Sequence, residues 1–185
     1  AEVVARLVEG RRLRAAASLP GVSPSRAAAL LEDAARLLPS SEQPGRALAR
    51  ARGARDGEGL DPATRLQRAR RLLWGELDPP DHAVAMLLQA EAEAPHRPEV
   101  LRVVAVGLAL AGESKAARDV TRRRGLADAS LEALVRQHAD AVDGVAVARR
   151  RHADRPSLDT ARELGWRAAA LERARWDLLE AADAP

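Results

Sequence analysis

The chain has 185 residues, enough to bury a stable core in a single domain, and its lack of cysteine excludes disulfides and thiolate metal sites. Thirty basic side chains against 27 acidic ones leave a net charge of +3, so the high pI reflects arginine chemistry and nucleic acid is not the favoured partner. No apolar run approaches the roughly 20 residues that a membrane helix requires, which predicts that the chain has no membrane span.

Residues 1–38 are predicted to form an N-terminal helical hairpin. Residues 2–17 carry Val4, Leu7 and Val8 at helical spacing, and Leu19-Pro20-Gly21 ends this helix. A second helix begins at Ser23-Pro24, where a capping residue precedes a proline at the first helical position. Its predicted buried residues are Ala27, Leu30, Leu31, Ala34 and Leu38.

Residues 39–60 are polar and rich in Gly, Pro and Ser, which indicates a flexible linker or a mobile loop. Within this stretch, residues 46–55 are able to form a short helix. The glycines at 53, 57 and 59 do not match a phosphate-binding loop, because no strand precedes them and no Gly-Lys-Ser/Thr follows. The acidic residues at 56, 58 and 61 lack the ligand order of a calcium loop.

Residues 61–126 are predicted to form two further helical hairpins. Asp61 caps a helix that starts at Pro62 and reaches Trp74, and the breaker Asp78-Pro79-Pro80 ends it. The next helix begins near residue 81, places Ala83, Leu87 and Ala90 on one face, and ends before Pro95. A third helix from Pro98 to Ala111, a turn at Gly112 and a fourth helix complete the second hairpin.

Small and large residues in this second hairpin resemble the tetratricopeptide pattern. Leu101, Ala105, Gly112 and Ala117 occupy the places of a large residue, a small residue, the turn glycine and a packing alanine. The resemblance implies helical hairpins stacked as a short α-solenoid that binds protein. Leu101 and Leu108 stand where the family prefers aromatic residues, and the first hairpin has Arg71 where a small residue is usual. An ordinary helical bundle with hairpins of similar length is the alternative.

Residues 127–185 are predicted to contain C-terminal helices. Arginines at 122–124 followed by Gly125 indicate the end of the preceding helix with a left-handed cap. The next helix carries an apolar stripe, Gly144 is expected to break or bend it, and a long terminal helix runs from Ser157 or Asp159 to about Ala182. The stripe consists of Leu131, Leu134, Val135, His138 and Val142.

The terminal helix carries two tryptophans on the side away from its apolar face. At about 100° per residue, Trp166 and Trp176 project roughly 140° from Leu171. Arg162 and Arg173 lie near them, and this composition is typical of a protein–protein interaction site. The alternative is a long helix that is buried on both faces. The predicted apolar face consists of Leu164, Ala168, Leu171, Ala174 and Leu178.

No pattern in the chain predicts an enzyme, a cofactor site or a metal site. The four histidines are scattered without the spacing of zinc ligands, and His138 is interpreted as a core residue. The serines lie at caps or in loops without a nucleophile motif, and the chain has no tyrosine. Arginine runs at 122–124 and 149–151 suit helix C-termini and lack the interleaved aromatics of nucleic-acid sites.

The sequence therefore predicts an all-α protein of about eight or nine helices, arranged as antiparallel hairpins, that acts as a non-catalytic scaffold or adaptor for another protein or peptide. A composition depleted in residues with AT-rich codons is typical of a very GC-rich genome, and we expect a bacterial one. The alternative is a structural subunit that self-associates through the terminal-helix tryptophans. The candidate partner-binding residues are Arg68, Arg71, Trp74, Arg102 and Val106 on the hairpins, and Arg162, Trp166, Arg173 and Trp176 on the terminal helix.

Overall fold

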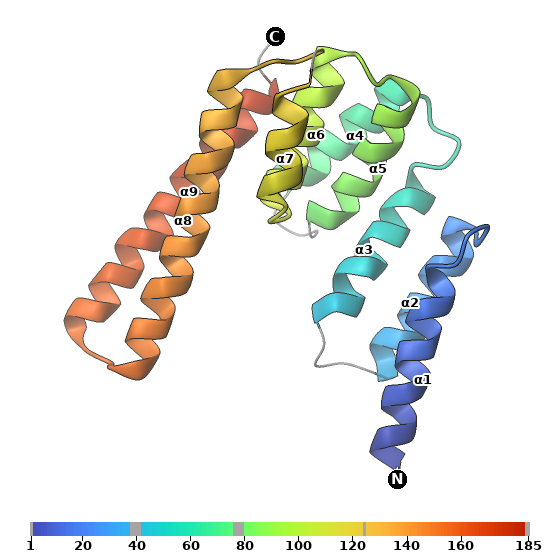
Figure 1. Cartoon of the computed structure of the whole chain (residues 1–185), viewed down its shortest axis with the longest axis horizontal. Coiled ribbons are helices and arrows are strands. Elements are labelled where there is room, and N and C mark those ends of the chain that lie inside the picture. The colour runs from blue at the N-terminus through green and yellow to red at the C-terminus, as the bar shows by residue number, and fades with distance from the viewer. Residues whose placement is uncertain (1, 38–41, 76–79, 124, 184–185) are drawn as a thin grey trace. The chain divides into compact units, whose positions relative to one another are not determined.

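The protein is all-α, as predicted. The computed structural model describes residues 2–37, 42–75, 80–123 and 125–183, and these residues form nine helices and no strand. Within each of two compact units, most helices that follow one another pack together, consistent with stacked hairpins (Figure 1). The chain divides into two compact units, Ala1–Glu93 and Ala94–Pro185. Of the predicted features, Leu38, Asp78-Pro79 and Arg124 lie outside the described residues.

The first unit contains five helices. They are α1 (Glu2–Ala17), α2 (Pro24–Leu37), α3 (Glu42–Asp56), α4 (Pro62–Trp74) and α5 (Pro80–Glu93). Helix α1 packs on α2 and α2 on α3, and both α3 and α4 pack against α5. Helix α5 is accordingly the central element and supplies the largest share of the core, with Ala83, Val84, Ala85, Met86, Leu87 and Ala90 buried.

Local sequence signals set the start of α4 as predicted. The Asp61 carboxylate accepts hydrogen bonds from the backbone N–H groups of Ala63 at 3.0 Å and Thr64 at 3.1 Å, and Pro62 occupies the first helical position. Hydrogen bonds from the Thr64 hydroxyl and backbone lower the pKa of the Asp61 carboxyl. The start of this helix is therefore fixed by contacts among neighbouring residues.

Helix α3 occupies most of the stretch for which the sequence predicts a linker or mobile loop. Two contacts attach it to α5. First, the Asp81 carboxylate, whose side chain is only 6% exposed, accepts hydrogen bonds from Arg46 Nε at 3.0 Å and Arg50 Nε at 2.8 Å. Second, Gly53 lies against α5 so closely that an added Cβ would stand 2.0 Å from the backbone oxygen of His82. A helix that appears polar in sequence is thus held by ion pairs and by one glycine contact.

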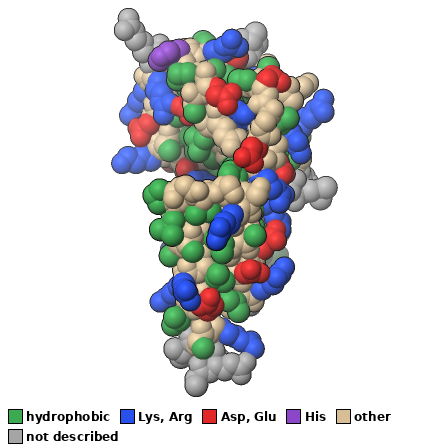
Figure 2. Space-filling model, turned by 90° about the vertical axis from the view of Figure 1, so that its right-hand side faces the viewer, with side chains coloured by type: hydrophobic (Ala, Val, Ile, Leu, Met, Phe, Trp, Pro, Cys, Tyr) green, Lys and Arg blue, Asp and Glu red, His purple; other side chains and the backbone are tan. Residues whose placement is uncertain are grey.

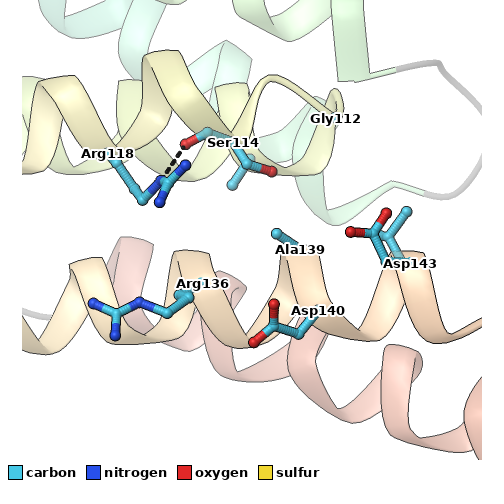
Figure 3. A pocket seen from close by; sticks show the side chains of 9 residues that line it. Gly112, Ser114, Arg118, Arg136, Ala139, Asp140 and Asp143 are labelled. Carbon is cyan, nitrogen blue, oxygen red and sulfur yellow. Dashed lines mark hydrogen bonds between the residues drawn. The ribbon is translucent and has the colours of Figure 1, made fainter.

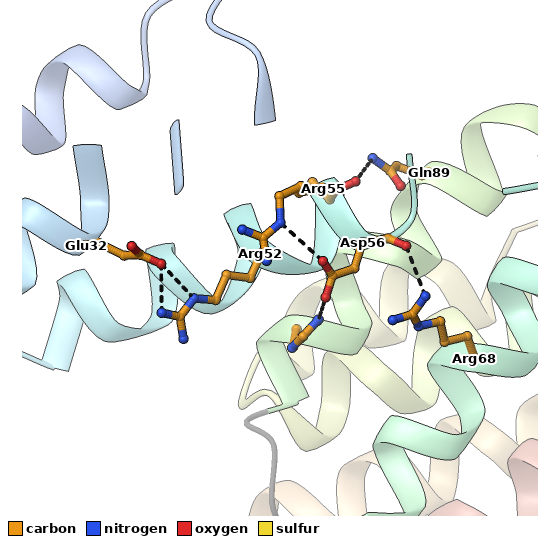
Figure 4. A network of polar contacts seen from close by, with 8 residues as sticks. Glu32, Arg52, Arg55, Asp56, Arg68 and Gln89 are labelled. Atoms are coloured by element: carbon orange, nitrogen blue, oxygen red, sulfur yellow. Dashed lines mark hydrogen bonds and ion pairs between the residues drawn. The ribbon is translucent and has the colours of Figure 1, made fainter. Parts of the chain in front are cut away.

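The end of α3 is held by further polar contacts (Figure 4). His82 Nε2 lies 3.2 Å from a carboxylate oxygen of Asp56, and the Gln89 amide donates to the backbone oxygen of Ala54 at 3.0 Å. Arg52 on α3 forms an ion pair with Glu32 on α2 at 2.8 Å, and this pairing lowers the pKa of the Glu32 carboxyl. These contacts join α2, α3 and α5.

A buried arginine closes the turn between α3 and α4. The Arg65 guanidinium donates to the backbone oxygens of Gly57 at 3.0 Å and Leu60 at 2.6 Å, and to the Glu93 carboxylate at 2.7 Å. Its side chain is only 5% exposed. Because backbone carbonyls after a helix end need partners, this one side chain satisfies two of them and links α4 to the end of α5.

The second unit contains four helices. They are α6 (Pro98–Leu110), α7 (Ser114–Thr121), α8 (Ala129–Asp154) and α9 (Leu158–Asp183). Helix α6 contacts α7, α8 and α9 and is buried along most of its length. Gly112 forms the predicted turn with φ of +80°, a backbone conformation that favours glycine. Leu101, Ala105 and Ala117 are fully buried, as their packing positions predict.

Helix α8 continues through Gly144, so of the predicted break or bend at this residue the break does not occur. The glycine faces α9, and an added Cβ would lie 3.4 Å from the Arg167 side chain, an ordinary van der Waals contact. Leu131, Val135 and His138 are buried as predicted, whereas Val142 is exposed. A helical glycine in contact with a neighbouring helix gives the same sequence signal as a helix break.

The connected ends of α8 and α9 form a two-helix arm with little buried surface. Ala148 is buried on α8 and Ala174 on α9, and no residue from 149 to 173 is buried. The buried residues of α9 are Ala174, Leu178, Leu179 and Ala182, all in its last ten residues. The predicted apolar face of α9 is therefore only partly correct, since Leu164 and Leu171 are half-buried and Ala168 is exposed.

Candidate partner-binding surfaces

The outer face of α9 carries the most exposed aromatic residues of the described chain. The side chain of Trp166 is 76% exposed and that of Trp176 is 46% exposed. Arg162 and Arg173 are exposed as well. At 100° per residue, these four side chains fall within an arc of about 80°, on the side opposite the buried residues of the helix. Their predicted exposure is confirmed, while their role in binding remains a prediction.

Two further residues extend this face, and the sequence reasoning missed them. Ala169 and Glu180 are exposed and lie in the same arc. With the four predicted residues they repeat at alternating intervals of four and three residues, which is the spacing of a seam between two paired helices. This spacing is the signal that could have identified the set. We call it the α9 stripe: Arg162, Trp166, Ala169, Arg173, Trp176 and Glu180.

The candidate residues on α4 have mixed surroundings. Arg68 and Arg71 are exposed, and Trp74 is half-buried at the last position of the helix. An Arg68 Nη atom lies 3.5 Å from the backbone oxygen of Asp56, at the end of α3 (Figure 4). Arg68 therefore has a structural contact within the first unit, and Arg71 presents its guanidinium to solvent.

The two candidates on α6 are placed differently from the prediction. Val106 is fully buried, whereas a partner-binding residue is expected to be exposed. Helix α6 lies in the middle of its unit, and a valine on any of its faces meets a neighbouring helix. Arg102 is only 18% exposed and lies 3.5 Å from the carboxylate of Asp128, the residue that caps α8. It contributes to the structure of the second unit.

A cleft between α7 and α8 was not predicted from the sequence. Its volume is about 340 Å³, and it opens beside the turn at Gly112. Figure 3 shows Arg118 and Arg136 toward one end, and Asp140 and Asp143 toward the other. Arg118 Nε donates to the backbone oxygen of Ser114 at 3.4 Å. The cleft is thus polar at both ends, with opposite charges, and its residues are too far apart in sequence to form a recognisable motif.

The described residues do not form a cluster suited to metal binding. No group of three or more His, Asp or Glu residues in the described ranges lies close enough to hold a metal ion. His138 is buried on α8, and burial, followed by the nearby positive charge of Arg175, lowers its pKa. Its Nδ1 has no hydrogen-bond partner. It is a core histidine, as predicted, kept neutral by its surroundings.

Ion pairs elsewhere in the second unit are structural. Arg122, beyond the end of α7, pairs with Glu132 near the start of α8, which lowers the pKa of the Glu132 carboxyl. Arg151 on α8 lies 3.1 Å from Glu163 on α9. Arg122 and Arg151 belong to the two arginine runs that the sequence places at helix C-termini, and each forms an ion pair within the second unit.

The first unit also carries exposed apolar residues, but they are scattered. Figure 2 shows hydrophobic side chains among arginines and carboxylates over α1 and α2. Leu7, Val8 and Leu19 are 39%, 58% and 60% exposed. Single exposed aliphatic residues are common on protein surfaces and carry little information about binding. The α9 stripe is the more informative surface, because it combines two large aromatic rings with regular spacing.

No helix among the described residues is sufficiently long and apolar to cross a membrane. Comparison of the chain with models of protein families, with curated proteins and with solved structures gives no match.

Proposed function

We propose that this protein is a non-catalytic binding module that holds a polypeptide partner on the α9 stripe. The observation that carries the proposal is the exposure of Trp166 and Trp176 on one face of α9, with Arg162 and Arg173 beside them. Trp and Arg are the residue types that dominate the energetics of protein interfaces. A tryptophan that is 76% exposed leaves a large apolar area in water, and burial against a partner would remove it.

The position of the stripe supports the same function. Its first four residues, from Arg162 to Arg173, lie on the arm formed by α8 and α9, where the chain itself buries no residue between 149 and 173. A partner can therefore lie along α9 without displacing a packed element of the second unit. The face is also long, because 18 residues separate Arg162 from Glu180, which is about 27 Å along a helix.

We also propose that the hairpins have a tetratricopeptide-like arrangement, which serves as the scaffold for the binding surface. It is supported by the burial of Leu101, Ala105 and Ala117 and by the turn at Gly112. In this reading the exposed Arg68 and Arg71 of α4 offer a second surface, suited to acidic side chains or a terminal carboxylate. The alternative function is that of a structural subunit in a homo-oligomer, with Trp166 and Trp176 at its interface.

The test compares binding by the wild-type chain and by the double variant Trp166→Ala/Trp176→Ala. Proteins captured by the wild-type chain are purified and titrated against both forms by calorimetry, and the chain is also titrated against itself by dilution. We expect the double variant to bind about 100-fold more weakly, because a central interface tryptophan commonly contributes 2 kcal/mol or more. Circular dichroism establishes that both forms are equally helical.

The control variant is Val8→Ala/Leu19→Ala. It also removes exposed apolar side chains, but from the first unit. We expect it to bind as the wild type does. Equal affinity of the wild type and the double tryptophan variant for every purified polypeptide would contradict the proposal. Loss of binding on Arg118→Ala, with the tryptophans dispensable, would move the binding site to the α7–α8 cleft.

A further inference from the structure

The positions along the α9 stripe are spaced symmetrically about its centre. Leu171 marks the midpoint of the stripe. Arg162 and Glu180 each lie nine residues from it, and Trp166 and Trp176 each lie five residues from it. Ala169 and Arg173 each lie two residues from it. When such a stripe meets a second copy running in the opposite direction, residues at equal distances from the midpoint face each other across a two-fold axis.

We propose that the polypeptide held on the α9 stripe is a second copy of this chain, with the two α9 helices antiparallel and centred at Leu171. The inference rests on the proposed binding role of the stripe, and its partner, a second copy, is the one that the alternative function requires. In this register Arg162 faces Glu180 of the second copy, and Trp166 faces Trp176 of the second copy. Because the arrangement is two-fold symmetric, each of these contacts occurs twice.

Each contact in this register is chemically complementary. The outermost layers pair a guanidinium with a carboxylate, and the described structure gives neither Arg162 nor Glu180 an ion pair within its own chain. The next layers stack two tryptophan rings. In the central layers Ala169 leaves space for the aliphatic part of Arg173 of the second copy, whose guanidinium is then close to a tryptophan ring.

The parallel arrangement lacks this complementarity. It would place Arg162 against Arg162 and Glu180 against Glu180, so both ends of the interface would bring like charges together. The alternating spacing of three and four residues suits either direction, but the charges favour only the antiparallel one.

Two acidic residues beside the stripe have a cation within their own chain. Glu163 lies 3.1 Å from Arg151 of α8, and Glu172 lies 3.8 Å from Arg175 of α9. The charge that these two carboxylates present to the second copy is therefore partly compensated within their own chain.

The experiment measures the solution mass of the full chain by light scattering and sedimentation over a concentration series. Its variants are Arg162→Glu, Glu180→Arg and the exchange Arg162→Glu/Glu180→Arg. Each single reversal places like charges opposite each other at both ends of an antiparallel pair, and we expect it to weaken dimerisation about tenfold. The exchange variant restores opposite charges and is expected to dimerise as the wild type does.

Mixing the two single variants gives an independent readout. In the mixed pair, both ends again bring opposite charges together, so Arg162→Glu and Glu180→Arg should form a heterodimer more stable than either homodimer. Residues 162 and 180 lie about 27 Å apart along one helix, so no contact within a single chain can explain a rescue by the exchange variant.

The absence of cysteine allows a direct test of the register. Arg162→Cys in one preparation and Glu180→Cys in another should form a disulfide when mixed under mild oxidation. The same oxidation of the Arg162→Cys variant alone should give little crosslinking, because an antiparallel pair holds its two copies of residue 162 far apart. Efficient crosslinking of that variant alone would overturn the antiparallel register in favour of a parallel one.

The outcomes separate this inference from the proposed function. A wild-type chain that stays monomeric at every concentration overturns self-pairing, and the proposed function is then judged by the titrations of other polypeptides. A dimer that is lost in Trp166→Ala/Trp176→Ala but is insensitive to the charge reversals overturns the register alone. A dimer unaffected by the tryptophan substitutions contradicts both proposals for this face.

Discussion

Substitution of Gly53 by alanine is predicted to destabilise the first unit, although it introduces a better helix former. An added Cβ would stand 2.0 Å from the backbone oxygen of His82 and 2.9 Å from its carbonyl carbon, whereas ordinary van der Waals contact begins at 3.4 Å. A flexible side chain could rotate away, but the backbone of α5 cannot. Helix α3 must therefore move away from α5 by well over an ångström.

The magnitude follows from the contacts that this movement disturbs. Alanine gains about 1 kcal/mol over glycine in helix propensity. Overpacking costs about 1–3 kcal/mol, and displacement of α3 also strains the contact between Asp56 and His82 and the hydrogen bond from Gln89 to Ala54, at about 1 kcal/mol each. The net expectation is a loss of about 2–4 kcal/mol in the free energy of unfolding of the first unit.

Thermal unfolding followed by circular dichroism measures this loss. For a unit of about 90 residues, a loss of this size lowers the unfolding midpoint by roughly 10–20 °C. Gly165→Ala is the matched control, because Gly165 lies within α9 and an added Cβ would have no atom within 4 Å. The control should stabilise the chain by about 1 kcal/mol. A Gly53→Ala variant as stable as the wild type would refute the close packing of α3 on α5.

Three further predictions concern buried polar groups. Asp81→Asn leaves Arg46 and Arg50 without their shared carboxylate and should lower the free energy of unfolding, measured in urea, by about 2 kcal/mol. This is less than for a fully buried pair, because both arginines are partly exposed. An unchanged midpoint would mean that the ion pairs do not hold α3. Arg65→Lys should lose about 2 kcal/mol, because one ammonium cannot reach the three acceptors that the guanidinium contacts, and stability equal to the wild type would contradict that geometry. Because the pKa of His138 is lowered in the folded state, the unfolded chain binds more protons, and stability should fall as the pH falls below about 6.5. His138→Leu should remove that part of the pH dependence, and an identical pH profile in the variant would exclude His138 as its source.

The sequence predicts most of the elements that local chemistry determines. Asp61 with Pro62 marks the start of α4, and Gly112 marks the turn between α6 and α7, because a cap and a left-handed turn are properties of a few adjacent residues. The exposure of Trp166 and Trp176 also follows from helical geometry, once the buried face of α9 is known.

Long-range contacts account for the features that the sequence did not predict. In the sequence, α3 has the composition of a polar linker, because the groups that hold it lie far along the chain. They are the Asp81 carboxylate, 31 residues from Arg50, and the backbone oxygen of His82, which faces Gly53. The sequence makes Val106 a candidate for binding, but in the structure α6 packs against three neighbouring helices and Val106 is buried. The α7–α8 cleft combines Arg118 with Asp143, which no short motif connects. In each case the decisive contact depends on which helices meet, and helical periodicity does not contain that information.

The sparse burial of the arm formed by α8 and α9 has a consequence for amide hydrogen exchange. Since no side chain between 149 and 173 is buried, the backbone hydrogen bonds at the tip of the arm are held mainly by the pairing of two helices, and their opening should require much less free energy than global unfolding. Amides near Trp166 should therefore exchange sooner than those near Leu178, which is fully buried. A molecule that binds the outer face of α9 should suppress this local unfolding. Slower amide exchange in the segment would therefore show that the face is bound, even before the partner is identified.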